Sequence, residues 1–415
     1  MKRPALFLTV LLIVLGTHLN AQQSSYQEDL EFLYHTLQQT PSYKDQITGD
    51  KKTRYRQLFE RLEREPVPTT ALDTFYSLSK LFWPIKDRHL AFYQDTYLTN
   101  NLKALNNPEF LKTYAASSEF KNYPRVNVNL DSLEKELSNK PKENVEGIYL
   151  LGDLGKIGIY RTARKDSLLG VVMSSYLKTW DRSQIFSVMI ETKPNFYRTV
   201  FCNFLVKGFV FSESSRFIAG RMQYYDLKKE GVNSYADYHS DKPYIFKQIK
   251  PEVQYLYLGS FQASNQNMVV AKAFYNTIKD TLKAPRLIVD LRTNYGGANK
   301  CADQFYSLIK SYSKQHKVYV LINAFVYSMG ERFALRLKSL KNTKLFGEDT
   351  NGKIAYGANI DNTLTLPSKR YKIYTTDMKD PANYLRYEEI GVKPDIYLNN
   401  DKDWLEQVLT YIDQH

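Results

Sequence analysis

The sequence has few of the residues that build covalent or metal-based scaffolds: its 415 residues include 2 cysteines and 6 histidines. Two cysteines cannot form a disulfide framework, although Cys202 and Cys301 could form one bridge or stay as two separate buried thiols. No spacing of His, Cys, Asp and Glu matches a metal site, and no glycine-rich phosphate loop is present. The sequence therefore predicts neither a metal nor another cofactor.

Long hydrophobic runs are also missing, since none reaches the roughly 20 residues that a membrane-spanning helix needs. The most apolar stretch, Ala5 to Gly16, follows the basic Lys2 and Arg3 and precedes the small Ala21. This order is typical of a secretory signal peptide. We therefore expect residues 1–21 to be a signal peptide, with an N-terminal anchor as the alternative. The mature protein would be exported, to the periplasm, the cell envelope or the medium, without an integral membrane span.

Acidic residues are fewer than basic ones, with 44 Asp and Glu against 57 Lys and Arg, so the formal net charge is +13. Loss of Lys2 and Arg3 with the signal peptide would lower it to +11. The basic residues are spread along the chain, with acids between them, and form no dense run. This pattern favours a solvated basic surface and argues against a nucleic-acid partner.

The length predicts two or three domains, at roughly 150 residues each. From Tyr26 to Leu81 apolar residues recur at intervals of three and four, which predicts helices with one buried face. Short apolar segments separated by Gly, Asp, Pro and Ser then predict a compact β barrel or sandwich. We divide this part of the chain into an N-terminal helical unit (22–94), a polar connecting region (95–144), a β-rich domain (145–225) and a linker (226–250).

The remainder alternates between strand and helix patterns. The apolar segment 286–291 is a continuous buried strand of the parallel type, and similar strands are expected at 255–258, 318–323 and 343–347. Amphipathic helices are expected between them, at 267–282, 298–309 and 328–340. We therefore predict an α/β core over 251–400, with its active site at strand ends and helix starts, and a C-terminal helix over 401–415.

A serine stands where such a site is expected. Ser328 follows an apolar strand and opens a helix, so its hydroxyl and the next backbone N–H, that of Met329, are free of helical hydrogen bonds. This arrangement suits a nucleophile with an oxyanion donor beside it. The alternative is a helix cap in which Ser328 and Glu331 form a capping box.

Two further segments support the nucleophile. Gly296 and Gly297 follow a strand end, and glycine lets a backbone N–H approach a substrate where a side chain would clash. Side chains just before them can brace this loop: Asp290, Arg292 and Asn294. Lys353 lies in a glycine-flanked turn 25 residues after Ser328. A partly desolvated lysine amine can accept a serine proton, although an exposed turn lysine would look the same in sequence.

Together these segments resemble the serine peptidase family of the C-terminal-processing and tricorn-like peptidases. The resemblance rests on DLRTNYGG at 290–297, SMGE at 328–331, GEDTNGK at 347–353 and GVKPD at 391–395, the last preceded by Glu388. It implies a ClpP/crotonase-like α/β peptidase core with Ser328 as nucleophile and Lys353 as general base. Gly296, Gly297 and Met329 would form the oxyanion hole, and protein or peptide chains would be the substrates.

The chain departs from the family pattern at two places. Gly357 stands where the processing peptidases carry a glutamine, and Tyr257 stands where tricorn carries a histidine. No PDZ-like stretch is recognisable, and the β-rich region occupies its place, as in envelope members from bacteria of the Bacteroides type. His89, two residues after Asp87, is therefore an alternative base or a substrate-site residue, or else a structural turn histidine.

We therefore predict an exported serine endopeptidase. The alternative is a catalytically inactive protein with the same core that binds a peptide or a hydrophobic ligand. The oligomeric state cannot be derived from the sequence.

Overall fold

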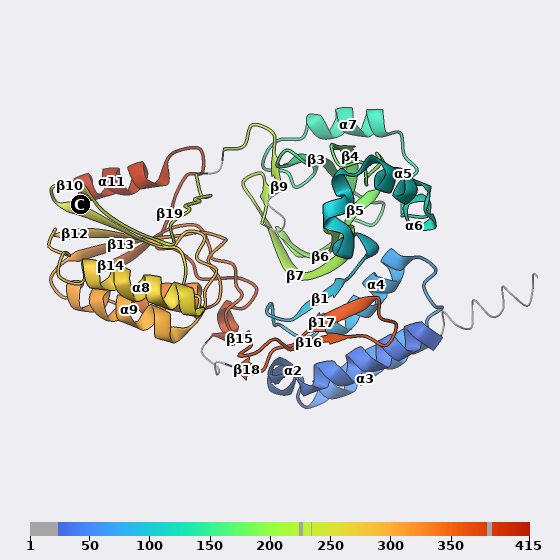
Figure 1. Ribbon diagram of the computed structural model, residues 1–415, viewed down its shortest axis with the longest axis horizontal. Coiled ribbons are helices and arrows are strands. Elements are labelled where there is room, and N and C mark those ends of the chain that lie inside the picture. Colours follow the sequence, from blue (N-terminus) through green and yellow to red (C-terminus); the bar gives the residue numbers. More distant parts are fainter. Residues whose placement is uncertain (1–23, 224–226, 234, 380–383) are drawn as a thin grey trace, which may run out of the picture. The chain divides into compact units, whose positions relative to one another are not determined.

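The computed structural model describes residues 24–223, 227–233, 235–379 and 384–415 (Figure 1). The predicted signal peptide, 1–21, lies outside the described residues. The chain forms two compact units. Unit 1 comprises residues up to Lys86, Leu90–Glu230 and Ala358–Met378, and unit 2 comprises Asp87–His89, Gly231–Gly357 and Lys379–His415.

Unit 1 begins with helices, as the periodicity predicts. A helix over 24–39 precedes α2 (Pro41–Gln46), α3 (Asp50–Arg64), α4 (Ala71–Ser79) and η1 (Lys80–Phe82). The hydroxyls of Thr40 and Thr70 cap α2 and α4 by accepting first-turn N–H groups. The apolar faces, with Leu33, Leu62 and Phe75 fully buried, pack into one core with the β strands of this unit. The connecting region contains η2 (Tyr97–Asn106), α5 (Pro108–Ala116), α6 (Ser118–Lys121) and α7 (Leu130–Ser138).

The β-rich region is a closed antiparallel barrel. Its strand order is β7-β6-β5-β4-β3-β2-β9-β8, and β8 pairs back onto β7. Closure pairs the backbone N–H and C=O groups that would be unpaired on the edge strands of an open sheet. The strands are β2 (Gly147–Leu151), β3 (Gly155–Arg161), β4 (Ser167–Ser175), β5 (Ile185–Lys193), β6 (Phe196–Cys202), β7 (Phe209–Ile218), β8 (Arg221–Met222) and β9 (Leu227–Lys229).

Three further strands extend this sheet beyond β7. They are β1 (Ala91–Gln94), β17 (Tyr371–Tyr374) and β16 (Thr363–Thr365), paired antiparallel in that order. Residues 358–378 therefore belong to unit 1, although the sequence division assigns them to the peptidase core. The reason is backbone pairing: Phe92 faces Ile373, far along the chain, and both side chains are fully buried in the core of unit 1.

Unit 2 is a three-layer α/β structure. Its sheet has the order β10-β11-β12-β13-β14-β19, in which only β10 runs antiparallel to its neighbour. The strands are β10 (Tyr244–Lys250), β11 (Val253–Leu258), β12 (Arg286–Asp290), β13 (Lys317–Ile322), β14 (Thr343–Gly347) and β19 (Ile396–Tyr397). The predicted linker 226–250 thus differs from the structure, because it contains β9 and β10.

Helices cover both faces of this sheet (Figure 1). On one face, side chains of α8 (Asn265–Ile278), α9 (Asn299–Tyr312) and α10 (Met329–Lys338) share a core with Leu256 and Val289. On the other face, Trp404 of α11 (Trp404–Gln414) packs with Tyr255 and Ile288. The predicted fold class, a mixed α/β protein with an N-terminal helical region and a β barrel, is confirmed. Within the described part of the chain, no helix has both the length and the hydropathy for a membrane crossing.

The two cysteines are separate buried thiols. Cys202 ends β6 in unit 1 and Cys301 lies in α9 of unit 2, and both are free. The sequence leaves open either one disulfide bridge or two separate thiols, and the structure has two separate thiols.

Candidate active site

The candidate site lies at the carboxyl ends of β12, β13 and β14. The loop after β12 carries Gly296 and Gly297, the segment after β13 leads to Ser328, and the turn after β14 carries Lys353. Since neighbouring parallel strands end at one edge of the sheet, these three segments meet there. The residues that the sequence singles out are thus brought together by the sheet.

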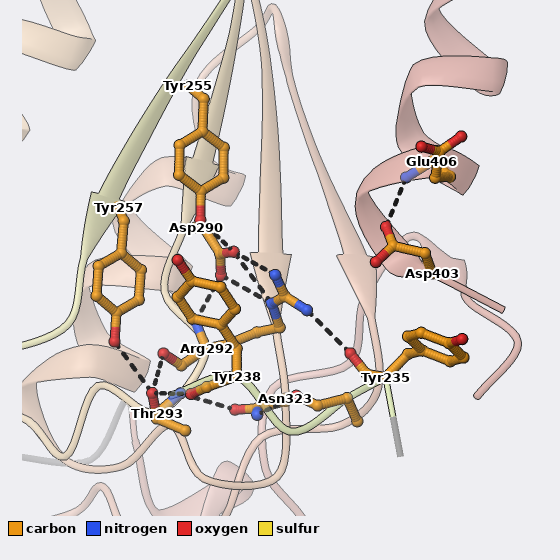
Figure 2. A network of polar contacts seen from close by, with 11 residues as sticks. Tyr235, Tyr238, Tyr255, Tyr257, Asp290, Arg292, Thr293, Asn323, Asp403 and Glu406 are labelled. Carbon is orange, nitrogen blue, oxygen red and sulfur yellow. Dashed lines mark hydrogen bonds and ion pairs between the residues drawn. The ribbon is translucent and has the colours of Figure 1, made fainter. Parts of the chain in front are cut away.

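A buried ion pair holds the start of the glycine loop (Figure 2). The Arg292 guanidinium donates to the Asp290 carboxylate, with Nη2 2.6 Å from Oδ2, and both side chains are buried. The Tyr255 hydroxyl donates to the same oxygen at 2.9 Å. On its outer side, Arg292 Nη1 donates to the Tyr235 carbonyl, and the guanidinium lies 4.7 Å from the ring of Tyr238. Through these contacts Asp290 and Arg292 fix the start of the loop.

Asn294 shapes the loop itself. Its side chain is fully buried, donates from Nδ2 to the Leu258 carbonyl and accepts the Gly296 N–H through Oδ1, both at 2.8 Å. The Gly296 N–H is therefore already used, which differs from its predicted role as an oxyanion donor. Gly296 instead provides space, because a Cβ there would lie 2.9 Å from both the Met329 nitrogen and the Ser328 Cβ. Of the two loop glycines, Gly297 is the one whose N–H has no acceptor among the described residues.

Ser328 sits in a strained turn between its strand and α10. Its φ is 52° and its ψ is −120°, a conformation that costs a non-glycine residue about 1–3 kcal/mol. Two hydrogen bonds hold it there, since the Ser328 N–H donates to the Lys353 carbonyl at 2.7 Å and to the Glu331 carboxylate at 3.2 Å. Met329 is the first residue of α10, so its N–H has no acceptor within the helix.

Glu331 ties the nucleophile to the turn after β14. Its fully buried carboxylate accepts the Thr350 hydroxyl at 2.6 Å, the Gly352 N–H at 2.7 Å and the Lys353 N–H at 2.9 Å, besides the Ser328 N–H. Burial raises its pKa, although these donors oppose that change. The contacts go beyond a helix cap, because they connect two loops of the candidate site.

His89 lies beside the serine. Its Nε2 is 3.2 Å from Ser328 Oγ, although the two residues are 239 positions apart in the sequence. Burial lowers the pKa of His89 well below its usual value, and the positive charges of Lys353, Arg332 and Arg88 add to this effect. A neutral imidazole near pH 7 can accept a proton, so the distance and the charge state both suit a general base.

Two carboxyl groups lie next to His89. Asp87, His89 and Glu388 each have a potential ligand atom within 4.8 Å of the others. The buried His89 Nδ1 has no hydrogen-bond partner among the described residues. Such a trio could hold a divalent cation, but both Glu388 oxygens already accept backbone N–H groups and His89 Nε2 faces Ser328. We therefore interpret it as a carboxyl pair close enough to the imidazole to stabilise its charged form, and Asp87 Oδ1 also accepts the His89 backbone N–H at 3.0 Å.

Glu388 also joins the turn segments around the site. Its Oε1 accepts the Arg88 N–H at 2.7 Å, and its Oε2 accepts the N–H groups of Ile354 and Ala355 at 2.9 and 2.8 Å. Burial and the charge of Asp87 raise the pKa of Glu388 to about 8. The Arg88 guanidinium donates to the Asn351 carbonyl. Arg88 is the residue of this group that the sequence analysis did not single out, and its adjacency to His89 was the only signal.

The structure assigns backbone contacts to Lys353. Its N–H donates to the Glu331 carboxylate, its carbonyl accepts the Ser328 N–H, and the positive charge of its side chain lowers the pKa of His89.

Tyr257 is buried and its hydroxyl lies 3.2 Å from the Thr293 hydroxyl (Figure 2), so this position belongs to the bracing network. Gly357 ends the short strand β15 (Tyr356–Gly357).

Comparisons with known proteins agree with the motifs. Residues 299–398 match the family model of peptidase family S41, and this segment includes Ser328, Lys353 and Glu388. No curated protein matches the chain.

Several solved structures are similar to the chain. The photosystem II D1 C-terminal processing protease is 14% identical, with a TM-score of 0.39, over 93% of this chain and 97% of that one. Mature CPAF is 10% identical, with a TM-score of 0.43, over 95% and 96%. A candidate peptidase from Parabacteroides merdae is 13% identical, with a TM-score of 0.39, over 94% and 96%.

Proposed function

The α/β unit carries a segment of peptidase family S41, and from this premise we propose that the protein is a serine-type endopeptidase that acts through an acyl-enzyme on Ser328. The contact that supports this proposal most directly is the 3.2 Å distance between His89 Nε2 and Ser328 Oγ. It pairs a nucleophile with a base at the start of a helix. The family resemblance suggests Lys353 as the base, but this contact favours His89.

The geometry supports the following reaction. His89 Nε2 takes the Ser328 hydroxyl proton as Oγ attacks the carbonyl carbon of the scissile peptide bond. The negative charge that develops on the carbonyl oxygen would be stabilised by the N–H groups of Met329 and Gly297. His89 then gives the proton to the leaving amine, which leaves an ester on Ser328. A water molecule, deprotonated by His89, hydrolyses this ester and regenerates the serine.

The acids near His89 would act on its charged form. When the imidazole gains a proton, a carboxylate within a few ångströms stabilises the new positive charge. Glu388 and Asp87 are coupled, since burial and the Asp87 charge raise the pKa of Glu388 to about 8. We assign both as positioning residues. We also propose that the protein acts after export, on protein or peptide chains outside the cytoplasm, as its N-terminal sequence suggests.

A fluorophosphonate probe would test the proposed nucleophile. This electrophile reacts with an activated serine hydroxyl, so incubation with the mature protein should give one covalent adduct. Peptide mapping by mass spectrometry should place it on Ser328, and Ser339, at the end of the same helix, serves as an internal control. An adduct elsewhere would contradict the assignment. No adduct, together with no turnover of unfolded protein substrates, would favour the inactive ligand-binding alternative.

The pH dependence of the reaction gives a second prediction. A base must be neutral, so activity should fall as the pH drops through the pKa of His89, which burial and neighbouring cations lower below 6.5. Removing the Lys353 charge makes the imidazolium less unfavourable, so Lys353→Met should move this acid limb to higher pH. The other titratable or charged groups near His89 are Arg88, Arg332, Asp87 and Glu388.

The measurement is the rate of probe labelling between pH 4 and 9. Lys338→Met is the matched control, because the Lys338 ammonium pairs with Asp395 at 2.9 Å. The acid limb of this variant should lie at the same pH as that of the unmodified protein. An unchanged acid limb in Lys353→Met would show that this lysine does not act on the base.

A further inference from the structure

Unit 1 has a cationic pocket that the peptidase chemistry does not use. It has a volume of about 570 Å³ and lies where α3, η1 and the turn between β3 and β4 come together. Its charged lining residues are all cations: Arg54, Arg61, Lys80 and Arg164. Two aromatic rings, Tyr76 and Trp83, form the apolar part. We name it the basic pocket.

Nearby acids neutralise these cations only in part. Arg61 and Lys80 share Glu65, at 3.7 and 3.5 Å, and Arg164 binds Asp166 at 2.7 Å. Arg54 has no carboxylate partner among the described residues, and it lies on the same face of α3 as Arg61, two turns away. Two acids therefore oppose four cations, which leaves a concave surface of positive potential that attracts anions.

Two packed rings form the aromatic side of the pocket. The Trp83 ring lies 5.9 Å from the Tyr76 ring, nearly perpendicular to it. Such rings present apolar surface that a ligand side chain can contact. Arg198 stacks over the Trp83 ring at 4.8 Å and donates to the Trp83 carbonyl at 3.2 Å, so a fifth cation packs against the aromatic side of the pocket.

We propose that the basic pocket binds an acidic peptide segment that also carries an apolar residue. The volume lies within the range of sites for organic ligands of many atoms and exceeds what a single inorganic anion fills. The cations are spread along the walls, and arginine matches carboxylates with paired N–H groups. The rings of Tyr76 and Trp83 would hold the apolar side chain. This binding does not depend on the chemistry of Ser328.

Calorimetric titration of the mature protein would test this site. Ser328→Ala serves as the background, so that a peptide cannot be consumed. The probe is the peptide acetyl-Glu-Glu-Phe-Glu-Glu-amide, and the same peptide with lysines in place of glutamates is the comparison. We expect the acidic peptide to bind and its affinity to fall with added salt. The double substitution Arg54→Gln/Arg61→Gln should weaken binding at least about tenfold.

Two more variants separate this site from a general surface effect. Trp83→Ala removes one of the two rings on the aromatic side of the pocket, so it should also weaken binding, by about fivefold. Arg56→Gln, on the same helix but 65% exposed and outside the pocket, should leave the affinity unchanged. Equal binding of the lysine peptide, or equal loss in Arg56→Gln, would overturn the proposal. So would displacement by inorganic phosphate at the peptide's own concentration, which would indicate a plain anion site.

Discussion

If the proposed mechanism holds, replacing His89 by alanine is expected to lower kcat/KM for peptide hydrolysis roughly 10³- to 10⁶-fold, as the loss of a general base does in serine peptidases. The reason is its position, 3.2 Å from Ser328 Oγ. The kcat/KM of Lys353→Met at pH 8 is expected to stay within about tenfold of the value for the unmodified protein. The substitution removes a charge near His89 but leaves the backbone contacts with Glu331 and Ser328 in place. Steady-state kinetics with an unfolded protein or a reporter peptide would measure both.

A matched control is available in unit 2. His316 packs against Tyr312 with ring centroids 4.6 Å apart, so His316→Ala removes an imidazole outside the site and should leave kcat/KM unchanged. Circular dichroism of each variant would show that it folds. The opposite order, with activity retained in His89→Ala and lost in Lys353→Met, would contradict our assignment and restore the lysine that the family pattern suggests.

The second large effect is expected at Arg292. Arg292→Met should destabilise unit 2 by about 3–5 kcal/mol, because it leaves the fully buried Asp290 carboxylate without its cation. The backbone N–H of residue 292 and the Tyr255 hydroxyl would still donate to Asp290, but neither carries a charge. Since this pair starts the loop that leads to Gly297, labelling of Ser328 should slow as well.

Hydrogen exchange followed by mass spectrometry suits this measurement, because the protein has two units and a single unfolding curve would mix them. Peptides that cover β12 should lose protection in Arg292→Met. Lys250→Met is the control, since its partner Asp413 is 53% exposed and such a surface pair contributes about 0–1 kcal/mol. The double variant Asp290→Asn/Arg292→Met should recover part of the loss. Equal protection in Arg292→Met and the control would contradict the role of this pair.

Local patterns predicted the α/β unit well. The continuous apolar run at 286–291 corresponds to β12, and the periodic helix expected at 328–340 corresponds to α10. Strand pairing between distant segments was not predictable in this way. Residues 358–378 were assigned to the peptidase core but belong to unit 1, where Tyr371–Tyr374 pairs with β1. This pairing joins segments that are far apart in the chain, and local sequence patterns do not show which distant strand a segment will pair with.

By itself, the sequence determined which segments form the parallel sheet and that Ser328 opens a helix beside a glycine loop, since these depend on residues close together in the chain. Only the tertiary structure decided which of the two candidate bases lies beside the serine. His89 lies 239 residues before Ser328, and it is held in unit 2 by its neighbour Arg88, whose N–H binds Glu388 and whose guanidinium binds the turn at Asn351. Such contacts depend on distances in space, which residue spacing does not record. The same holds for Gly296, whose N–H is taken by Asn294, and for the basic pocket, whose cations come from separate elements.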